Sequence, residues 1–159
     1  MNIADLTGTA LDYWVARSLP EFVREIYFTD SGETVAVRGN DRGRPWDGRF
    51  VPSESWEAAG VVLERVRRIE LRDGDPAFCA AEFEGGTRAV QAYGATRREA
   101  LLRAFVASRF GETVGTMVRQ PQAVDGTTME LTAEPGAVGD VEDLPRPDAQ
   151  IGDVGSLPR

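Results

Sequence analysis

Residues with the chemistry to hold a ligand are concentrated between Pro52 and Glu64, where hydroxyl groups, an indole ring and a carboxylate alternate with small side chains. Ser53, Ser55 and Trp56 stand near the start of this block, and Glu64 closes it. An aromatic face combined with hydroxyls and a carboxylate suits a nucleobase, a ribose or a similar flat polar ligand. The competing interpretation is structural, with Trp56 anchoring the core and Glu64 carrying a charge at a strand edge.

A second candidate site is the polar loop that we expect over residues 39–49, which contains Arg44, Trp46 and Arg49. Guanidinium groups could hold a phosphate there while the indole ring stacks on a base. Loops rich in arginine and glycine are also common as plain solvated turns, so both interpretations stay open.

The residues available for catalysis are few, because the chain contains no histidine. This removes Ser-His triads, Cys-His dyads, histidine general bases and most zinc sites. Cys79 falls on the apolar face of a predicted strand and is expected to be a buried structural residue. Glu82 and Glu84 share the wet face of that strand, where a solvated surface is favoured over a metal or acid–base pair. The sequence therefore predicts no catalytic residue, no metal and no cofactor.

The formal net charge of −8 argues against non-specific binding to DNA. Most of the acidic excess lies late in the chain: residues 116–159 hold three arginines and eight acids, whereas residues 1–115 hold fifteen arginines and eighteen acids. Every basic residue is arginine. GC-rich codon usage explains this bias, and selection for planar contacts to phosphate or carboxylate is the alternative.

Two helices are predicted near the ends of the folded region. Thr96 and Glu99 have the spacing of a capping box, and an apolar stripe that includes Phe105 follows them. Gly111 stands where a left-handed C-terminal cap is expected. An earlier helix is predicted within residues 6–17, with Thr7 as its N-cap.

Between these helices the apolar pattern predicts short strands at residues 25–30, 33–38, 50–52, 66–71, 77–84 and 87–93. Residues 53–64 are interpreted as a loop or short turn, because Gly60 interrupts their helical pattern. The expected fold is α+β with two layers. An N-terminal helix and a long C-terminal helix pack on one antiparallel sheet of four to six strands.

The domain is expected to span residues 1–115, followed by an acidic, proline- and glycine-rich tail at residues 116–159. The tail has five prolines and no aromatic residue, so it cannot bury enough apolar surface to offset its ordering entropy. No apolar run approaches the length of a membrane span, and the N-terminus lacks a secretory pattern. These features predict a cytoplasmic protein that does not associate with a membrane.

Three blocks of the chain carry a family likeness. Residues 6–17 contain Leu-Thr-Gly followed by Leu-Asp, residues 50–64 contain Pro-Ser-x-x-Trp, and the predicted C-terminal helix ends in Phe-Val-Ala-Ser-Arg-Phe-Gly-Glu-Thr-Val. In order and spacing these blocks resemble NinX-like bacteriophage proteins over most of residues 3–115. Ser55 stands where that family usually has Asp, and Ala59-Gly60-Val61 stands where it usually has Gly-Gly-Pro.

The resemblance implies a small phage accessory protein and carries over no catalytic residue. Our first hypothesis is a non-enzymatic binding protein in the host cytoplasm that sequesters a nucleotide-type small molecule, such as a host defence signal. The alternative is an inhibitor of a host enzyme or defence factor that presents an acidic surface mimicking nucleic acid. An RNA-binding domain and a carboxylate hydrolase rank behind these two. The sequence leaves open whether the protein forms a homo-oligomer.

Overall fold

A computed structural model describes residues 1–86 and 88–124 of the chain. These residues belong to one unit, Met1–Gly126. Its elements in chain order are η1 (Ile3–Asp5), α1 (Gly8–Arg17), β1 (Val23–Thr29), η2 (Asp30–Gly32), β2 (Thr34–Asp41), β3 (Arg44–Arg49), α2 (Trp56–Leu63), β4 (Val66–Arg72), β5 (Ala77–Phe83), β6 (Val90–Gly94), α3 (Arg97–Phe110) and β7 (Gln122–Ala123). None of the described helices is long and apolar enough to cross a membrane.

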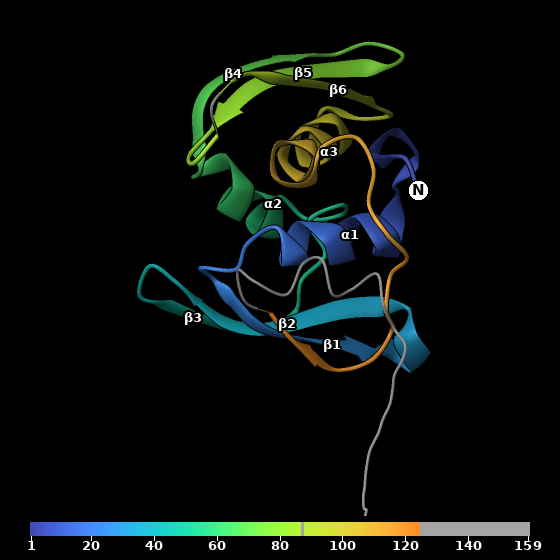
Figure 1. Cartoon of the computed structure of the whole chain (residues 1–159), viewed down its shortest axis with the longest axis vertical. Helices are drawn as coiled ribbons and strands as arrows, with labels where there is room; N and C mark the ends of the chain where they lie inside the picture. Colours follow the sequence, from blue (N-terminus) through green and yellow to red (C-terminus); the bar gives the residue numbers. More distant parts are fainter. Residues whose placement is uncertain (87, 125–159) are drawn as a thin grey trace, which may run out of the picture. The chain divides into compact units, whose positions relative to one another are not determined.

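Helices α1, α2 and α3 lie between two antiparallel sheets (Figure 1). One sheet has the strand order β3-β2-β1-β7 and the other has the order β4-β5-β6. The α+β class, the N-terminal helix and the long C-terminal helix are confirmed. The strands, however, form two sheets rather than one, so the helices make a middle layer.

Helix α1 packs against β1, β2 and α3, while β5 and β6 pack on α3. Every residue from Leu11 to Arg17 is buried, including Asp12, so this helix must be covered on all sides. A helix buried all round needs packing partners on more than one face. The sequence does not show that α1 is buried on all sides, because polar residues such as Asp12 and Arg17 suggest an exposed face.

The core confirms two side-chain predictions. Phe105 on α3 is fully buried, and its ring centroid lies 5.1 Å from that of Phe83 on β5. Cys79 is buried in the same sheet, and burial raises the pKa of its thiol to about 11. Glu84 lies at the surface, as predicted, and forms an ion pair with Arg42 at 2.8 Å.

Two segments that were predicted as loops are regular elements. The turn at Arg42 and Gly43 has positive φ at both residues, 55° and 93°, and it joins β2 to β3 in a hairpin. Residues 50–52 do not form the predicted strand, and the Phe50 side chain is buried in the core. Helix α2 forms despite Gly60, because a single glycine lowers helix stability by only about 1 kcal/mol.

Residues 116–124, which the sequence assigns to the tail, contact the domain. The Gln122 side-chain oxygen accepts hydrogen bonds from the Tyr13 hydroxyl at 2.7 Å and from Arg17 at 2.6 Å. Strand β7 pairs with β1, and Val124 is buried. These contacts hold residues 116–124 on the domain, while residues 125–159 of the expected tail lie outside the described part of the chain.

Candidate functional site

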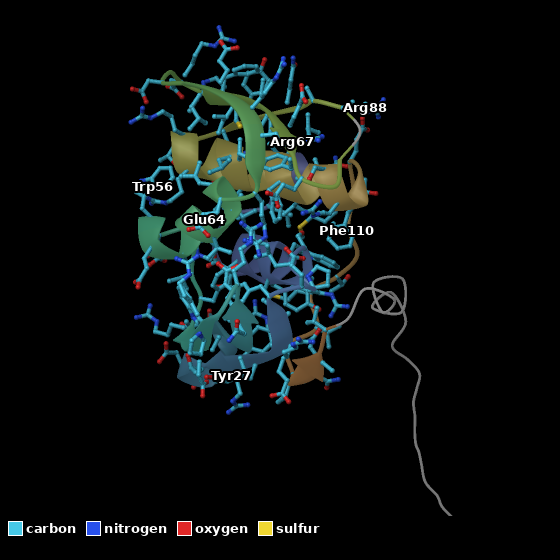
Figure 2. The ribbon with its side chains drawn as sticks, turned by 90° about the vertical axis from the view of Figure 1, so that its left-hand side faces the viewer. Tyr27, Trp56, Glu64, Arg67, Arg88 and Phe110 are labelled. Atoms are coloured by element: carbon cyan, nitrogen blue, oxygen red, sulfur yellow. The ribbon has the colours of Figure 1, made fainter. Side chains whose placement is uncertain are left out.

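A depression of about 260 Å³ opens beside the first turn of α2. Trp56 forms one wall with 45% of its surface exposed, and Figure 2 shows it at the surface of the molecule. The other walls come from the β4–β5 turn, the start of β5 and the start of α3. The lining residues are Trp56, Asp73, Gly74, Ala77, Ala95, Thr96, Arg97 and Arg98.

Helix caps position both sides of this depression. The Ser55 hydroxyl accepts a hydrogen bond from the Ala58 amide at 3.4 Å, which starts α2 at Trp56. On the other side, the Thr96 hydroxyl accepts from the Glu99 amide at 3.0 Å, as the capping box predicts. The Glu99 carboxylate completes the box through the amide of Ala95.

Gly94 lets the chain turn closely into α3. A Cβ atom added there would lie 2.7 Å from the Ala100 amide nitrogen, which is closer than real side chains approach. Arg97 and Arg98 follow in the first turn of α3 and line the depression together with Trp56.

The two arginines differ in how fully they are used. The Arg98 guanidinium carbon lies 5.6 Å from the Trp56 ring centroid, and its Nε donates to the Ser53 carbonyl at 3.1 Å. Arg97 forms an exposed ion pair with Asp73 at 3.0 Å. Within the described residues, the terminal nitrogens of Arg98 have no hydrogen-bond partner. These donors can therefore reach a ligand in the depression.

Asp12 supports the site from the buried side. It is 2% exposed, and its carboxylate accepts from the Ser53 amide at 2.7 Å and from the Ser53 hydroxyl at 2.9 Å. Burial raises the pKa of Asp12 to about 7, and the two Ser53 hydrogen bonds offset part of that rise. The Ser53 hydroxyl is thus occupied by Asp12, and neither residue lines the depression.

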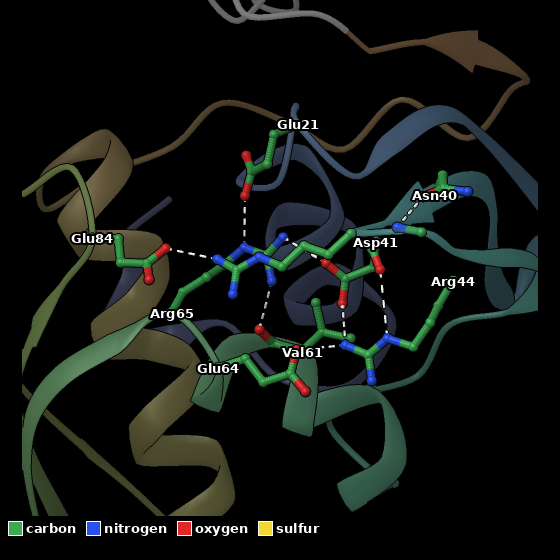
Figure 3. Close-up of polar contacts among 10 residues, drawn as sticks. Glu21, Asn40, Asp41, Arg44, Val61, Glu64, Arg65 and Glu84 are labelled. Atoms are coloured by element: carbon green, nitrogen blue, oxygen red, sulfur yellow. Dashed lines mark hydrogen bonds and ion pairs between the residues drawn. The ribbon is translucent and has the colours of Figure 1, made fainter.

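Arg44 and Glu64 belong to a different region, at the far end of α2. They form an ion pair at 2.7 Å beside the buried Arg65, which is 1% exposed on its side chain (Figure 3). The Arg65 guanidinium donates to Glu21 at 2.6 Å, to Asp41 at 2.9 Å and to the carbonyl of Val61, also at 2.9 Å. We call these residues the Arg65 cluster. Its charges are paired with one another, which indicates a structural role.

Trp46 and Arg49 lie on β3, away from the depression. The Trp46 ring packs edge-to-face against Phe50 at 5.5 Å and against Phe22 at 6.0 Å. Its indole nitrogen donates to the Arg49 carbonyl at 3.0 Å. Of the seven predicted site residues, Trp56 alone lines the depression, while Ser53 and Ser55 hold its walls in place.

Sequence reasoning missed Asp12, Arg97 and Arg98. One available signal was the pair of arginines in the first turn of a capped helix, where the helix dipole favours acidic residues. A second was the aspartate within the apolar pattern of residues 8–17. Both features break a local rule, as functional positions often do.

No group of three or more potential metal-ligating side chains occurs among the described residues. The prediction that the protein needs no metal stays a prediction.

Comparison with known proteins places the chain in one family. Residues 2–109 match the family described as bacteriophage P22 NinX, which is well over half of the chain. No curated protein matches the sequence. The matched region contains every residue that lines the depression and ends before the segment that carries β7. The chain therefore belongs to the bacteriophage P22 NinX family.

Proposed function

We propose that this phage protein is a non-enzymatic binding protein that takes a nucleotide-type small molecule into the depression beside Trp56. The observation that carries the proposal is the exposed Trp56 indole with Arg98 against it, in a hollow that also contains Arg97. A planar ring, two cations and the terminal N–H groups of Arg98 match a base joined to a phosphate.

Each part of such a ligand has a counterpart in the site. Stacking of a base on an aromatic side chain contributes about 1–3 kcal/mol. The terminal nitrogens of Arg98 would hold a phosphate oxygen, and Arg97 would join after exchanging Asp73 for the ligand. That exchange costs little, because exposed ion pairs contribute only about 0–1 kcal/mol.

Sequestration fits this site better than turnover. The chain has no histidine, and the Asp12–Ser53 pair lies behind the depression rather than in its wall. We therefore propose that the protein lowers the free concentration of its ligand in the host cytoplasm, where a nucleotide signal of host defence is the favoured target.

Calorimetric titration with AMP, ADP-ribose and cyclic mono- and dinucleotides tests the proposal. We expect Trp56→Ala and Arg98→Gln each to weaken binding by about tenfold or more, since 1.4 kcal/mol corresponds to a factor of ten. Tyr93→Ala and Arg24→Gln are matched controls, because both residues are exposed and neither lines the depression. A wild-type protein that binds no compound of the panel would contradict the proposal and leave the inhibitor hypothesis first.

A further inference from the structure

We propose that Asp12 is a positioning residue for this site: its carboxylate holds Ser53, and the Ser53 carbonyl holds Arg98 against Trp56. Ligand binding therefore depends on whether the Asp12 carboxyl is ionised. The inference rests on the proposed function for its ligand. Its mechanical part can be measured without any ligand.

The connection joins α1, the segment before α2, and α3. Asp12 on α1 accepts both hydrogen bonds of Ser53, at 2.7 and 2.9 Å. The Ser53 carbonyl accepts from Arg98 Nε on α3 at 3.1 Å, and the Arg98 guanidinium lies 5.6 Å from the Trp56 ring centroid. Ser53 precedes α2 by three positions, so any movement of Ser53 acts on Arg98 and Trp56 together.

Protonation would change this connection directly. An ionised carboxylate accepts hydrogen bonds through both oxygens, whereas a protonated one must donate through one of them. One Ser53 contact would then be reversed or lost, and hydrogen bonds to a carboxylate are stronger than those to a neutral acid. Burial places the pKa of Asp12 at about 7, which puts the change within the ordinary working range of a cell.

Two charged groups act on this carboxyl besides Ser53. Arg98 from α3 lowers the pKa of Asp12, and Glu54 from the segment before α2 raises it. Neutralising Asp12 would also make the surroundings of Arg98 more positive, which favours an anion. We expect the loss of positioning to outweigh this effect, because Asp12 lies outside the depression while Arg98 and Trp56 form its wall.

The ligand-free test uses the full chain labelled with 5-fluorotryptophan, with the Trp56 fluorine signal assigned through Trp56→Phe. In the wild type we expect that signal to titrate with a midpoint near pH 7. Asp12→Asn preserves the side-chain shape and should abolish the titration. A Trp56 signal that does not titrate, or that still titrates in Asp12→Asn, would overturn the proposal.

Two further variants shift the midpoint in opposite directions and do not depend on the folding of Asp12→Asn. Ser53→Ala removes one hydrogen bond that favours the carboxylate, so its midpoint should rise. Glu54→Gln removes a neighbouring negative charge, so its midpoint should fall. Shifts in the same direction, or none, would also contradict the proposal.

The binding test uses the tightest nucleotide of the calorimetric panel as the probe. We expect its affinity to fall by about tenfold from pH 8 to pH 6 in the wild type and to stay nearly constant in Asp12→Asn. A titrating Trp56 signal without nucleotide binding would refute the proposed function alone. Nucleotide binding with an identical pH profile in Asp12→Asn would refute the positioning role alone.

Discussion

Two arginine-rich regions at opposite ends of α2 show how differently the same side chain is used. In the Arg65 cluster, Nε and both terminal nitrogens of Arg65 have partners, and the side chain is 1% exposed. Beside Trp56, Arg98 uses its Nε and leaves its terminal nitrogens without partners in the described region. An arginine with every nitrogen engaged holds the fold together, whereas one held by a single hydrogen bond is oriented and still available to a ligand.

This contrast gives a partial answer to the use of arginine throughout the chain. Arg65 needs the planar, multidirectional geometry of a guanidinium, because it joins Glu21, Asp41 and the end of α2 at once. An ammonium group could not reach all three positions in the same way. At this position, therefore, the choice of arginine over lysine has a structural reason besides codon usage.

The largest effect on stability is expected in the Arg65 cluster. Arg65→Met should lower the free energy of unfolding by about 3–5 kcal/mol, because it removes the buried cation between Glu21 and Asp41 and leaves the Asp41 carboxylate with only the longer 3.3 Å contact to Arg44. Urea denaturation followed by circular dichroism measures this. A change below about 1 kcal/mol would mean that the cluster is no more important to the fold than the surface pair of Arg97.

The second prediction concerns the pH dependence of stability. Asp12 has a pKa of about 3.8 when unfolded and about 7 when folded, so between these values the folded state binds more protons than the unfolded state. The stability contributed at this position is present below pH 4 and is lost as the pH rises to about 7, by roughly 2–4 kcal/mol.

Asp12→Asn should therefore be more stable than the wild type at pH 8, and this advantage should shrink as the pH falls. Urea denaturation of both proteins between pH 5 and pH 8 measures the difference. A wild type that gains stability relative to Asp12→Asn on going to pH 8 would show that the sign is wrong.

The third prediction concerns the C-terminal segment that the structure adds to the domain. A chain ending at residue 115 loses Gln122, the partner of Tyr13 and Arg17, and should be destabilised by about 1–3 kcal/mol. A chain ending at residue 124 keeps these contacts and is the matched control. The composition of the removed residues 125–159 predicts that this control has a melting temperature close to that of the full chain. Equal melting temperatures for the two shortened chains would show that residues 116–124 contribute nothing to stability.

Local patterns in the sequence predicted the elements that local forces determine. The capping box of Thr96 and Glu99, the buried Phe105 and the hairpin of β1 and β2 are all as expected. Helix α2 is not predicted, because Gly60 interrupts its apolar pattern, whereas the Ser55 cap starts the helix in the structure. The cap was there to be read from the sequence.

The candidate site could be predicted only in part, because its contacts join distant positions. Ser53 is 41 residues from Asp12 and 45 residues from Arg98. No periodicity or spacing rule reports a pairing of that kind. The division of the strands into two sheets could not be predicted for the same reason, since it depends on the packing of β1 and β2 on α1 and of β5 and β6 on α3.

The smallest effect on stability is expected at Arg98, beside the exposed Trp56. Arg98→Gln removes one hydrogen bond and a cation above an exposed ring, so it should change the free energy of unfolding by less than about 1 kcal/mol. The same variant should weaken nucleotide binding by about tenfold or more. Urea denaturation and calorimetry on one preparation separate the two effects. A loss of stability as large as that of Arg65→Met would mean that Arg98 is a structural residue too. Arg98 would then not differ from Arg65 in its role, and the argument that its terminal nitrogens serve a ligand would fail.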